Sequence, residues 1–293
     1  MKPAPFKYLA PETVEDALNL LSQHGDDAKL LAGGQSLIPT MNFRLAEPAV
    51  IIDLNRVSEL NYIRETRRSG GLSIGAMTRQ RQVERSDLVA QKAPLLYETM
   101  PFIAHPQIRN RGTVGGSIAH ADPAAEFPAV FTALNAKFRL QSQSGNRWVS
   151  IDEFYLGMFA TALTADEMLV EIELPASPKR SGFAFKEVAR RHGDYAIVGV
   201  ATAVTLDRKG RCEDVNLVFL SVGDGPVTAK QAAVTLTGET PTSQLIEAAA
   251  EAAAQQDIDP GDDLHATAAY RRHLANTLAK QTLTLAFERA QNS

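Results

Sequence analysis

The sequence predicts an α+β protein with two small mixed units followed by a C-terminal α+β domain. Three patterns support this prediction. Short strand and helix patterns alternate over residues 1–56, a hairpin and mixed segments fill residues 57–177, and three consecutive strand patterns precede two long helical ones in residues 178–293. A chain of 293 residues also exceeds what one core usually organises. We therefore expect boundaries after residues 56 and 177.

The first unit is expected to contain helix, strand, helix and strand. A helix opens near Pro11 and is ended by Gly25, with apolar residues spaced along one face. A short buried strand at 29–32 delivers a glycine pair, a second helix starts near Ser36, and a second strand covers 50–54.

The second unit begins with a hairpin pattern at 61–64 and 72–75 around Gly70-Gly71. Helices are expected at 78–86 and 94–100, and a loop at 105–111 in which the His105–Pro106 peptide bond is either cis or trans. Asp122 followed by Pro123 is typical of a helix N-cap and first helical residue. Three strand patterns finish the unit, at 137–141, 147–151 and 169–174.

The last unit shows three strand patterns joined by short connections, which favours a three-stranded antiparallel sheet. The strands are expected at 183–189, 197–206 and 215–220. Two helical patterns follow, at 243–256 and at 265–290, separated by Asp259-Pro260-Gly261.

Composition excludes several classes of function. The net charge of −4 and the pI near 5.9 provide no excess of positive charge for nucleic acid. The longest clean apolar stretch, 196–204, is far shorter than the roughly 20 residues of a spanning helix, so no membrane insertion is expected. The first six residues lack the apolar region of a signal peptide, and we therefore expect a cytoplasmic protein.

Cysteine and histidine usage argues against a metal centre in this chain. The single cysteine, Cys212, excludes an internal disulfide and any iron–sulfur cluster held by this chain's own thiolates. The six histidines show no zinc-ligand spacing with carboxylates, so we predict no metal.

Two similar glycine pairs are the most informative local feature. They occur in Ala32-Gly33-Gly34-Gln35-Ser36 and in Thr113-Val114-Gly115-Gly116-Ser117, each where a strand pattern gives way to a helix start. A glycine pair permits positive φ and removes Cβ, so amide N–H groups converge on an anion, while the serine caps the next helix. Each pair alone is typical of a tight turn; together they predict one pyrophosphate held from two sides. The G-x-G-x-x-G fingerprint and the P-loop are both missing from the sequence.

These segments carry a resemblance to a known family. Leu31 to Pro39, Gln107 to Ser117, Ala121 to Glu126, Gly193 to Val198 and Tyr270 to Leu274 resemble the FAD-binding medium subunit of molybdenum hydroxylases. The likeness is to the carbon monoxide dehydrogenase and xanthine dehydrogenase family, and it covers essentially the whole chain.

The resemblance implies an FAD-binding fold of the p-cresol methylhydroxylase and vanillyl-alcohol oxidase (PCMH/VAO) type, made of two subdomains, followed by the C-terminal domain. In such proteins FAD takes electrons from iron–sulfur clusters and passes them to an external acceptor. The partners are an iron–sulfur small subunit and a molybdopterin large subunit, arranged as a dimer of heterotrimers (a heterohexamer). No catalytic residue beyond the flavin is implied.

The resemblance also implies roles for single residues. Residues 32–36 and 113–117 would hold the FAD pyrophosphate through backbone N–H groups, with hydroxyl contacts from Ser36 and Ser117. Glu126 matches a position at which relatives keep an acid near the flavin or its ribityl chain. The alternative is a solvent-exposed glutamate on a helix. Leu169 would pack near the flavin. Asp122 would lie at the same site, although helix capping explains it better.

Two further residues are expected at the flavin ring itself. Lys186 matches a strand lysine that approaches the cofactor, where it would stabilise charge on the reduced ring; an edge lysine that discourages aggregation is the alternative. Tyr195 would lie beside the ring face, against the alternative of an ordinary half-buried strand tyrosine. Arg109 and Arg111 either add charge near the phosphates, face a partner, or form surface salt bridges.

Two other functions remain open at this point. One is a stand-alone flavin oxidoreductase with its own substrate, which should add an acid–base pair or a covalent flavin link; the sequence shows neither. The other is a non-catalytic scaffold whose glycine loops hold a nucleotide. The substrate of the molybdenum subunit, the electron acceptor and the docking surfaces are not specified by the sequence.

Overall fold

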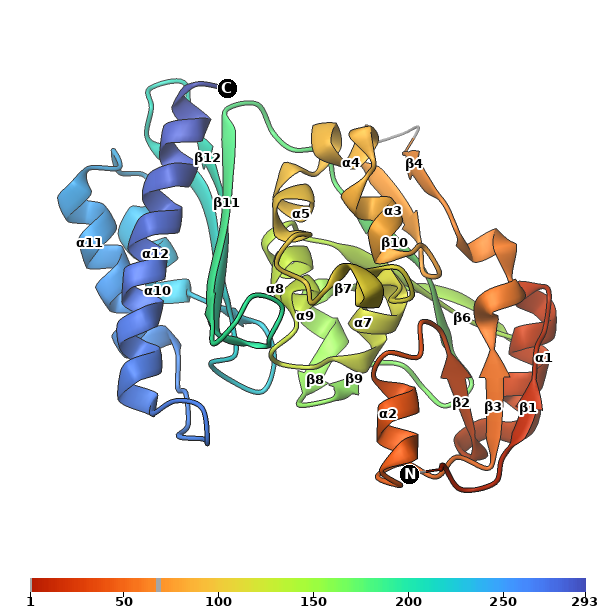
Figure 1. The fold of residues 1–293 in the computed structure, drawn as a ribbon. Coiled ribbons are helices and arrows are strands. Elements are labelled where there is room, and N and C mark those ends of the chain that lie inside the picture. The colour runs from red at the N-terminus through yellow and green to blue at the C-terminus, as the bar shows by residue number, and fades with distance from the viewer. Residues whose placement is uncertain (1, 67–69) are drawn as a thin grey trace.

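The computed structural model describes residues 2–66 and 70–293, which form three main sheets, each with its own helices (Figure 1). The predicted α+β class is confirmed. The expected turn of the first hairpin includes residues 67–69, which lie outside the described residues.

The first sheet is parallel, in the order β1-β3-β2. Its strands are β1 Lys7–Leu9, β2 Ala28–Leu31 and β3 Val50–Asp53. Helix α1 Val14–His24 is capped by Thr13 and ended by Gly25 at φ 47°, and α2 Leu37–Asn42 joins β2 to β3. Because β2 and β3 are parallel neighbours, the loop after β2 and the end of β3 lie at the same sheet edge.

The second sheet is antiparallel, in the order β4-β5-β10-β6-β7. Its strands are β4 Ile63–Glu65, β5 Leu72–Gly75, β6 Lys137–Ser142, β7 Gly145–Ser150 and β10 Met168–Leu174. A small separate hairpin, β8 Tyr155–Gly157 with β9 Ala160–Thr161, was not predicted.

Seven helices of the described residues accompany this sheet. They are α3 Gln80–Glu84, α4 Asp87–Lys92, α5 Pro94–Thr99, α6 Pro106–Arg109, α7 Val114–His120, α8 Glu126–Ala133 and α9 Ile151–Phe154. The segment expected as a loop at 105–111 therefore contains α6. The His105–Pro106 bond is trans, as the described residues include no cis peptide bond.

The C-terminal sheet is antiparallel, in the order β11-β12-β13-β14. The three predicted strands are β11 Ser181–Ala189, β12 Ala196–Leu206 and β13 Cys212–Leu220, and the two-residue β14 Val227–Thr228 is added at the edge. The helices are α10 Lys230–Leu236, which was not predicted, α11 Ser243–Ala252 and α12 Ala268–Gln291. A π-helical turn, Ala253–Asp257, extends α11.

The C-terminal sheet lies between two helical layers (Figure 1). Helix α12 covers β11 and β12 on one face, while α5 and α8 of the preceding unit pack on the other. Alternate residues of β11 therefore enter different cores: Phe185 joins the core of the second sheet and Ala184 that of the C-terminal domain. Among the described residues, no helix combines the length and apolarity needed to cross a membrane.

Candidate functional site

The two glycine pairs, 82 positions apart in the chain, meet in space. A Cβ added to Gly33 would lie 2.5 Å from the Arg111 carbonyl oxygen and 2.7 Å from the Gly112 Cα. A Cβ on Gly116 would lie 3.2 Å from the Ala32 Cβ. The absence of Cβ atoms therefore lets the two backbones touch, as the prediction of one shared cavity requires.

The first glycine segment provides the free donors of the site. Gly34 is the only member of the two pairs with positive φ, at 72°, and this turn leads directly into α2. Within the described residues, the backbone N–H groups of 33–37 donate no intramolecular hydrogen bond. Ser36 occupies the N-cap of α2, but its hydroxyl makes no capping bond, contrary to the expected capping role. These amides and the hydroxyl are thus free to bind an anion.

The second glycine segment is organised differently from the prediction. Helix α7 begins at Val114, capped by the Thr113 hydroxyl, so Gly115 and Gly116 lie in its first turn. Val114 and Gly115 donate their N–H groups to Thr78 and Ala76, and those of Gly116 and Ser117 go to Thr113. Ser117 is therefore not a cap either. The second segment therefore lets the first glycine segment come close and offers the Ser117 hydroxyl, but the amide N–H groups of 114–117 are already paired.

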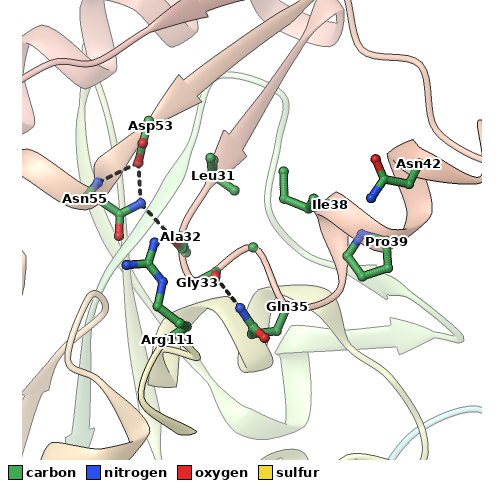
Figure 2. A pocket seen from close by; sticks show the side chains of 11 residues that line it. Leu31, Ala32, Gly33, Gln35, Ile38, Pro39, Asn42, Asp53, Asn55 and Arg111 are labelled. Atoms are coloured by element: carbon green, nitrogen blue, oxygen red, sulfur yellow. Dashed lines mark hydrogen bonds between the residues drawn. The ribbon is translucent and has the colours of Figure 1, made fainter. Parts of the chain in front are cut away.

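A cavity of about 360 Å³ opens beside the first segment (Figure 2). Its walls come from the glycine turn, from α2 through Ile38 and Asn42, from the end of β3 through Asp53, and from Arg111. Tyr8 donates its hydroxyl to Asp53 at 2.5 Å, and the Asn55 amide N–H donates to the same carboxylate at 2.9 Å. Asp53 is thereby fixed at the sheet edge where the glycine turn begins.

Three arginines near the second segment have different roles. Arg109 is buried, and it binds Glu84 with two hydrogen bonds of 3.1 Å and the Ile103 carbonyl at 2.7 Å. Arg111 instead lines the cavity. Arg79 donates to the Arg111 carbonyl and to the Asn55 side-chain oxygen, and burial together with the charge of Arg111 lowers its pKa. Arg111 thus lines the cavity with Arg79 beside it, and an anion bound there would offset the repulsion between the two charges.

Acidic side chains gather beyond the other end of α7. Asp122 was expected to cap a helix, and this was wrong: α8 begins at Glu126, and the Asp122 carboxylate accepts the Ala124 N–H within the turn before it. Glu126 is buried rather than solvated, and its burial, followed by the charge of Asp122, raises its pKa to about 7. α7 spans about 10 Å at 1.5 Å per residue, so these acids lie about one short helix length from the glycine contact.

Glu187 joins this group from the C-terminal domain. Burial, followed by the charge of Glu126, raises its pKa to about 8, and its Oε2 is buried without a hydrogen-bond partner. Partial burial and the carboxylates of Asp122 and Glu126 also raise the pKa of Tyr195. Sequence reasoning missed Glu187 because strand alternation alone does not tell which of two neighbouring charged residues faces the preceding unit.

The remaining predicted residues lie apart from the glycine contact. Tyr195 is 69% exposed in the loop between β11 and β12, which packs on the second unit where the His192 and His105 rings are 6.4 Å apart. Lys186 lies on the edge strand β11, on the face opposite to Glu187. Leu169 is buried in the core of the second sheet. Leu169 shares that core with Val114 of the second glycine segment, because α7 packs on β10.

The acidic pair makes a testable contribution to stability. The folded pKa values of about 7 and about 8 exceed the ordinary value of 4.5, so the folded chain holds protons that the unfolded chain releases. That stability is complete below about pH 4.5 and is lost as the pH rises through 7 and 8. In Glu187→Gln the side chain is neutral at every pH in this range. We expect it to unfold with a free energy at least about 1 kcal/mol above that of the wild type at pH 8.5, a difference that disappears at pH 5.

Urea unfolding of both chains at several pH values measures this difference. Glu47→Gln, at an exposed carboxylate, is the matched control and should follow the wild type throughout. A difference between Glu187→Gln and the wild type that stays constant from pH 5 to 8.5 would contradict the assignment.

The residues present fit a dinucleotide with a diphosphate bridge. The free amides of residues 33–35, the Asp53 carboxylate and Arg111 line the cavity, and the backbone contacts beside it leave no room for Cβ atoms. Sequence reasoning missed Arg79, Asn55 and Asp53; the position of Asp53 at the end of the strand next to the glycine turn was the signal that could have found it.

Comparison with known proteins supports this interpretation. Residues 4–177 match the family model of the FAD binding domain in molybdopterin dehydrogenase. Residues 183–286 match that of the CO dehydrogenase flavoprotein C-terminal domain.

Individual relatives cover nearly the entire chain. A 6-hydroxypseudooxynicotine dehydrogenase complex subunit alpha from Paenarthrobacter nicotinovorans is 44% identical over 99% of this chain and 97% of its own length. The structure of carbon monoxide dehydrogenase from Hydrogenophaga pseudoflava superposes with a TM-score of 0.94 at 40% identity, covering 99% of both chains. Reconstituted CO dehydrogenase from Oligotropha carboxidovorans gives a TM-score of 0.93 at 35% identity, over 99% of this chain and all of that one.

The glycine contact, the cavity and the whole-chain matches lead to one conclusion. The chain belongs to the family of FAD-binding medium subunits of molybdenum hydroxylases, of the carbon monoxide dehydrogenase type.

Proposed function

We propose that this chain binds FAD with its diphosphate bridge between the two glycine segments and serves as the electron-transfer subunit of a molybdenum hydroxylase. The observation that carries the proposal is the contact of Gly33 with Arg111 and Gly112 beside a 360 Å³ cavity. When bound, the flavin supplies two-electron chemistry that links iron–sulfur clusters of a partner to an external acceptor.

The chain's own residues hold and orient the cofactor in this proposal. Amides of 33–37 and the hydroxyls of Ser36 and Ser117 donate to the phosphate oxygens, and Arg111 adds charge. The fixed carboxylate of Asp53 offers an acceptor to ribose hydroxyls at the adenosine end. This part of the site comes from the first two units, for which we propose the boundaries 1–56 and 57–177, with 178–293 as the third.

The other predicted residues belong to the flavin end. Glu126 accepts hydroxyl hydrogen bonds near the ribityl chain, with Asp122 beside it, and exposed Tyr195 covers a ring face. Leu169 contributes apolar packing beneath this region. Lys186 remains our candidate for stabilising charge on the reduced ring.

We further propose that the partners are an iron–sulfur small subunit and a molybdopterin large subunit, assembled as a dimer of heterotrimers in the cytoplasm. The relatives' names support a multi-subunit assembly, since they are a subunit of a dehydrogenase complex and medium chains. Cys212 is the single cysteine of the sequence and is buried, so this chain does not by itself supply the thiolates of an iron–sulfur cluster.

Purification from the native host tests this assembly. A tagged chain is expected to bring down two further polypeptides, with iron and molybdenum measurable by elemental analysis and with FAD bands that dithionite bleaches. Isolation of the chain as a complete enzyme with its own substrate, without iron or molybdenum, would contradict the proposal. A colourless chain loaded with ADP would instead identify a nucleotide-binding scaffold.

A further inference from the structure

A second cavity, of about 730 Å³, lies between the second unit and the C-terminal domain. It shares no lining residue with the glycine-segment cavity. Its walls are the start of α5, the linker from β10 to β11, and the β12–β13 turn; this linker runs beside α4 and α5 in Figure 1. The volume falls within the range of small-molecule sites in proteins.

Three cationic side chains line this cavity together with the carboxylates of Asp207 and Glu213. Lys179 and Arg180 enter from the linker and Arg208 from the β12–β13 turn. The Arg180 Nε is buried and has no hydrogen-bond partner. Protein atoms cover this Nε, and no described residue accepts from the outer N–H groups of the same guanidinium, which are therefore available to an anion in the cavity.

The backbone holds Arg180 in this position. Its φ of 62° lies in the left-handed region, which residues other than glycine rarely adopt, and its carbonyl accepts the Leu206 N–H at 3.0 Å. The hydrogen bond ties the linker to the end of β12. Arg180 is therefore presented to the cavity by a fixed segment rather than by a free surface loop.

Two carboxylates of the wall do not neutralise Arg180. Asp207 accepts the N–H groups of Lys209 and Arg211 and pairs with the Arg211 side chain at 2.9 Å, so it is occupied within its own turn. Glu213 is exposed, and neither carboxylate bonds to Arg180 in the described part of the chain.

The rest of the wall is mixed, with polar Gln91, Ser177, Ser181 and Ser293 beside four apolar residues. Pro94, Phe183 and Leu206 face the cavity from three different elements. An inorganic anion alone would leave this surface uncovered and would fill only a small part of the volume. A compact apolar body with one charged group would cover it.

From this arrangement we propose that the cavity binds a small organic anion, with a carboxylate accepting from the Arg180 guanidinium and an aromatic or aliphatic body against Phe183 and Leu206. The ligand contacts both the linker and α5, so its binding stabilises the seam between the two units. This site is independent of the proposed FAD site.

Calorimetric titration of the FAD-loaded chain with benzoate tests the proposal, with benzamide as its neutral counterpart and inorganic phosphate as the bare anion. We expect saturable benzoate binding at least tenfold tighter than that of benzamide or phosphate. Arg180→Gln should weaken benzoate binding at least tenfold. Arg85→Gln, at an exposed arginine away from the cavity, should not change it.

Arg180→Gln could also unfold the linker, so a second variant keeps the test decisive. Lys179→Gln/Arg208→Gln removes two exposed charges of the same wall and is expected to weaken benzoate binding while leaving the melting temperature and FAD content unchanged. Equal binding of benzoate and benzamide, phosphate binding as tight as benzoate, or benzoate binding unaffected by these variants would each overturn the proposal.

Discussion

Gly33→Ala is expected to abolish retention of FAD on the purified chain, and Gly33→Val to do so even at high cofactor concentration. The added Cβ would lie 2.5 Å from the Arg111 carbonyl oxygen and 2.7 Å from the Gly112 Cα. Both are backbone atoms, which cannot rotate away, so the two segments must separate. Overpacking of this kind costs about 1–3 kcal/mol, and it displaces the donors of the phosphate site.

Substitutions at Gly33 and Gly116 should weaken FAD binding to different extents. A Cβ on Gly116 meets the Thr113 hydroxyl oxygen at 2.7 Å, a side-chain atom that can move, so Gly116→Val should weaken FAD binding less than Gly33→Val. Gly261→Ala is the control, because no atom lies within 4 Å of its added Cβ. FAD content is read from the flavin absorption of each purified variant, with circular dichroism to check folding. Full FAD content in both Gly33→Val and Gly116→Val would show that the segments are misassigned.

Arg109→Met is expected to lower the free energy of unfolding by about 3 kcal/mol. The substitution removes four hydrogen bonds, two to Glu84 and one each to the Ile103 and Ala104 carbonyls. It leaves Glu84 with Arg81 alone and two backbone acceptors without this donor. Because Arg109 precedes Arg111, which contacts Gly33, the variant should also bind FAD more weakly.

Denaturant unfolding of the variant measures this loss. Arg85→Met changes an exposed arginine on the segment after α3. Its free energy of unfolding should stay within about 0.5 kcal/mol of the wild-type value, which is the usual range for surface substitutions. Adding Glu84→Leu to Arg109→Met should recover part of the loss, since an apolar pair replaces a partly buried carboxylate that keeps only Arg81 as its partner. If Arg109→Met has the same free energy of unfolding as the wild type, the Arg109–Glu84 ion pair does not stabilise the second glycine segment.

The sequence predicted the main elements because their periodicity is strong. Strands β11, β12 and β13 and helices α1 and α12 were found within a few residues. The missed elements are short, and tertiary packing rather than a long apolar repeat determines them; they are β1, α4, α6, α9, α10, β14 and the β8–β9 hairpin. Helix α7 was expected after its glycine pair and not around it, because glycine is unfavourable inside helices unless close packing, here against Ala76, requires it.

The site was predictable only in part. The two glycine segments could be identified because glycine repeats are visible along the chain, and the structure brings them into contact. Which amides are free could not be predicted, since the N–H groups of Val114 and Gly115 donate to the carbonyls of Thr78 and Ala76, respectively, in another segment. Arg109 lies in a buried ion pair, whereas Arg111 lies in the cavity wall. This difference also depends on residues that are distant in the sequence.

The comparison of FAD with FMN tests the central claim most directly. Quenching of flavin fluorescence on addition of the cofactor-free chain gives both dissociation constants. If the two glycine segments hold the bridge between riboflavin and adenosine, FAD should bind at least about 100-fold more tightly than FMN, a difference of about 2.7 kcal/mol. Equal dissociation constants for FAD and FMN would contradict the account.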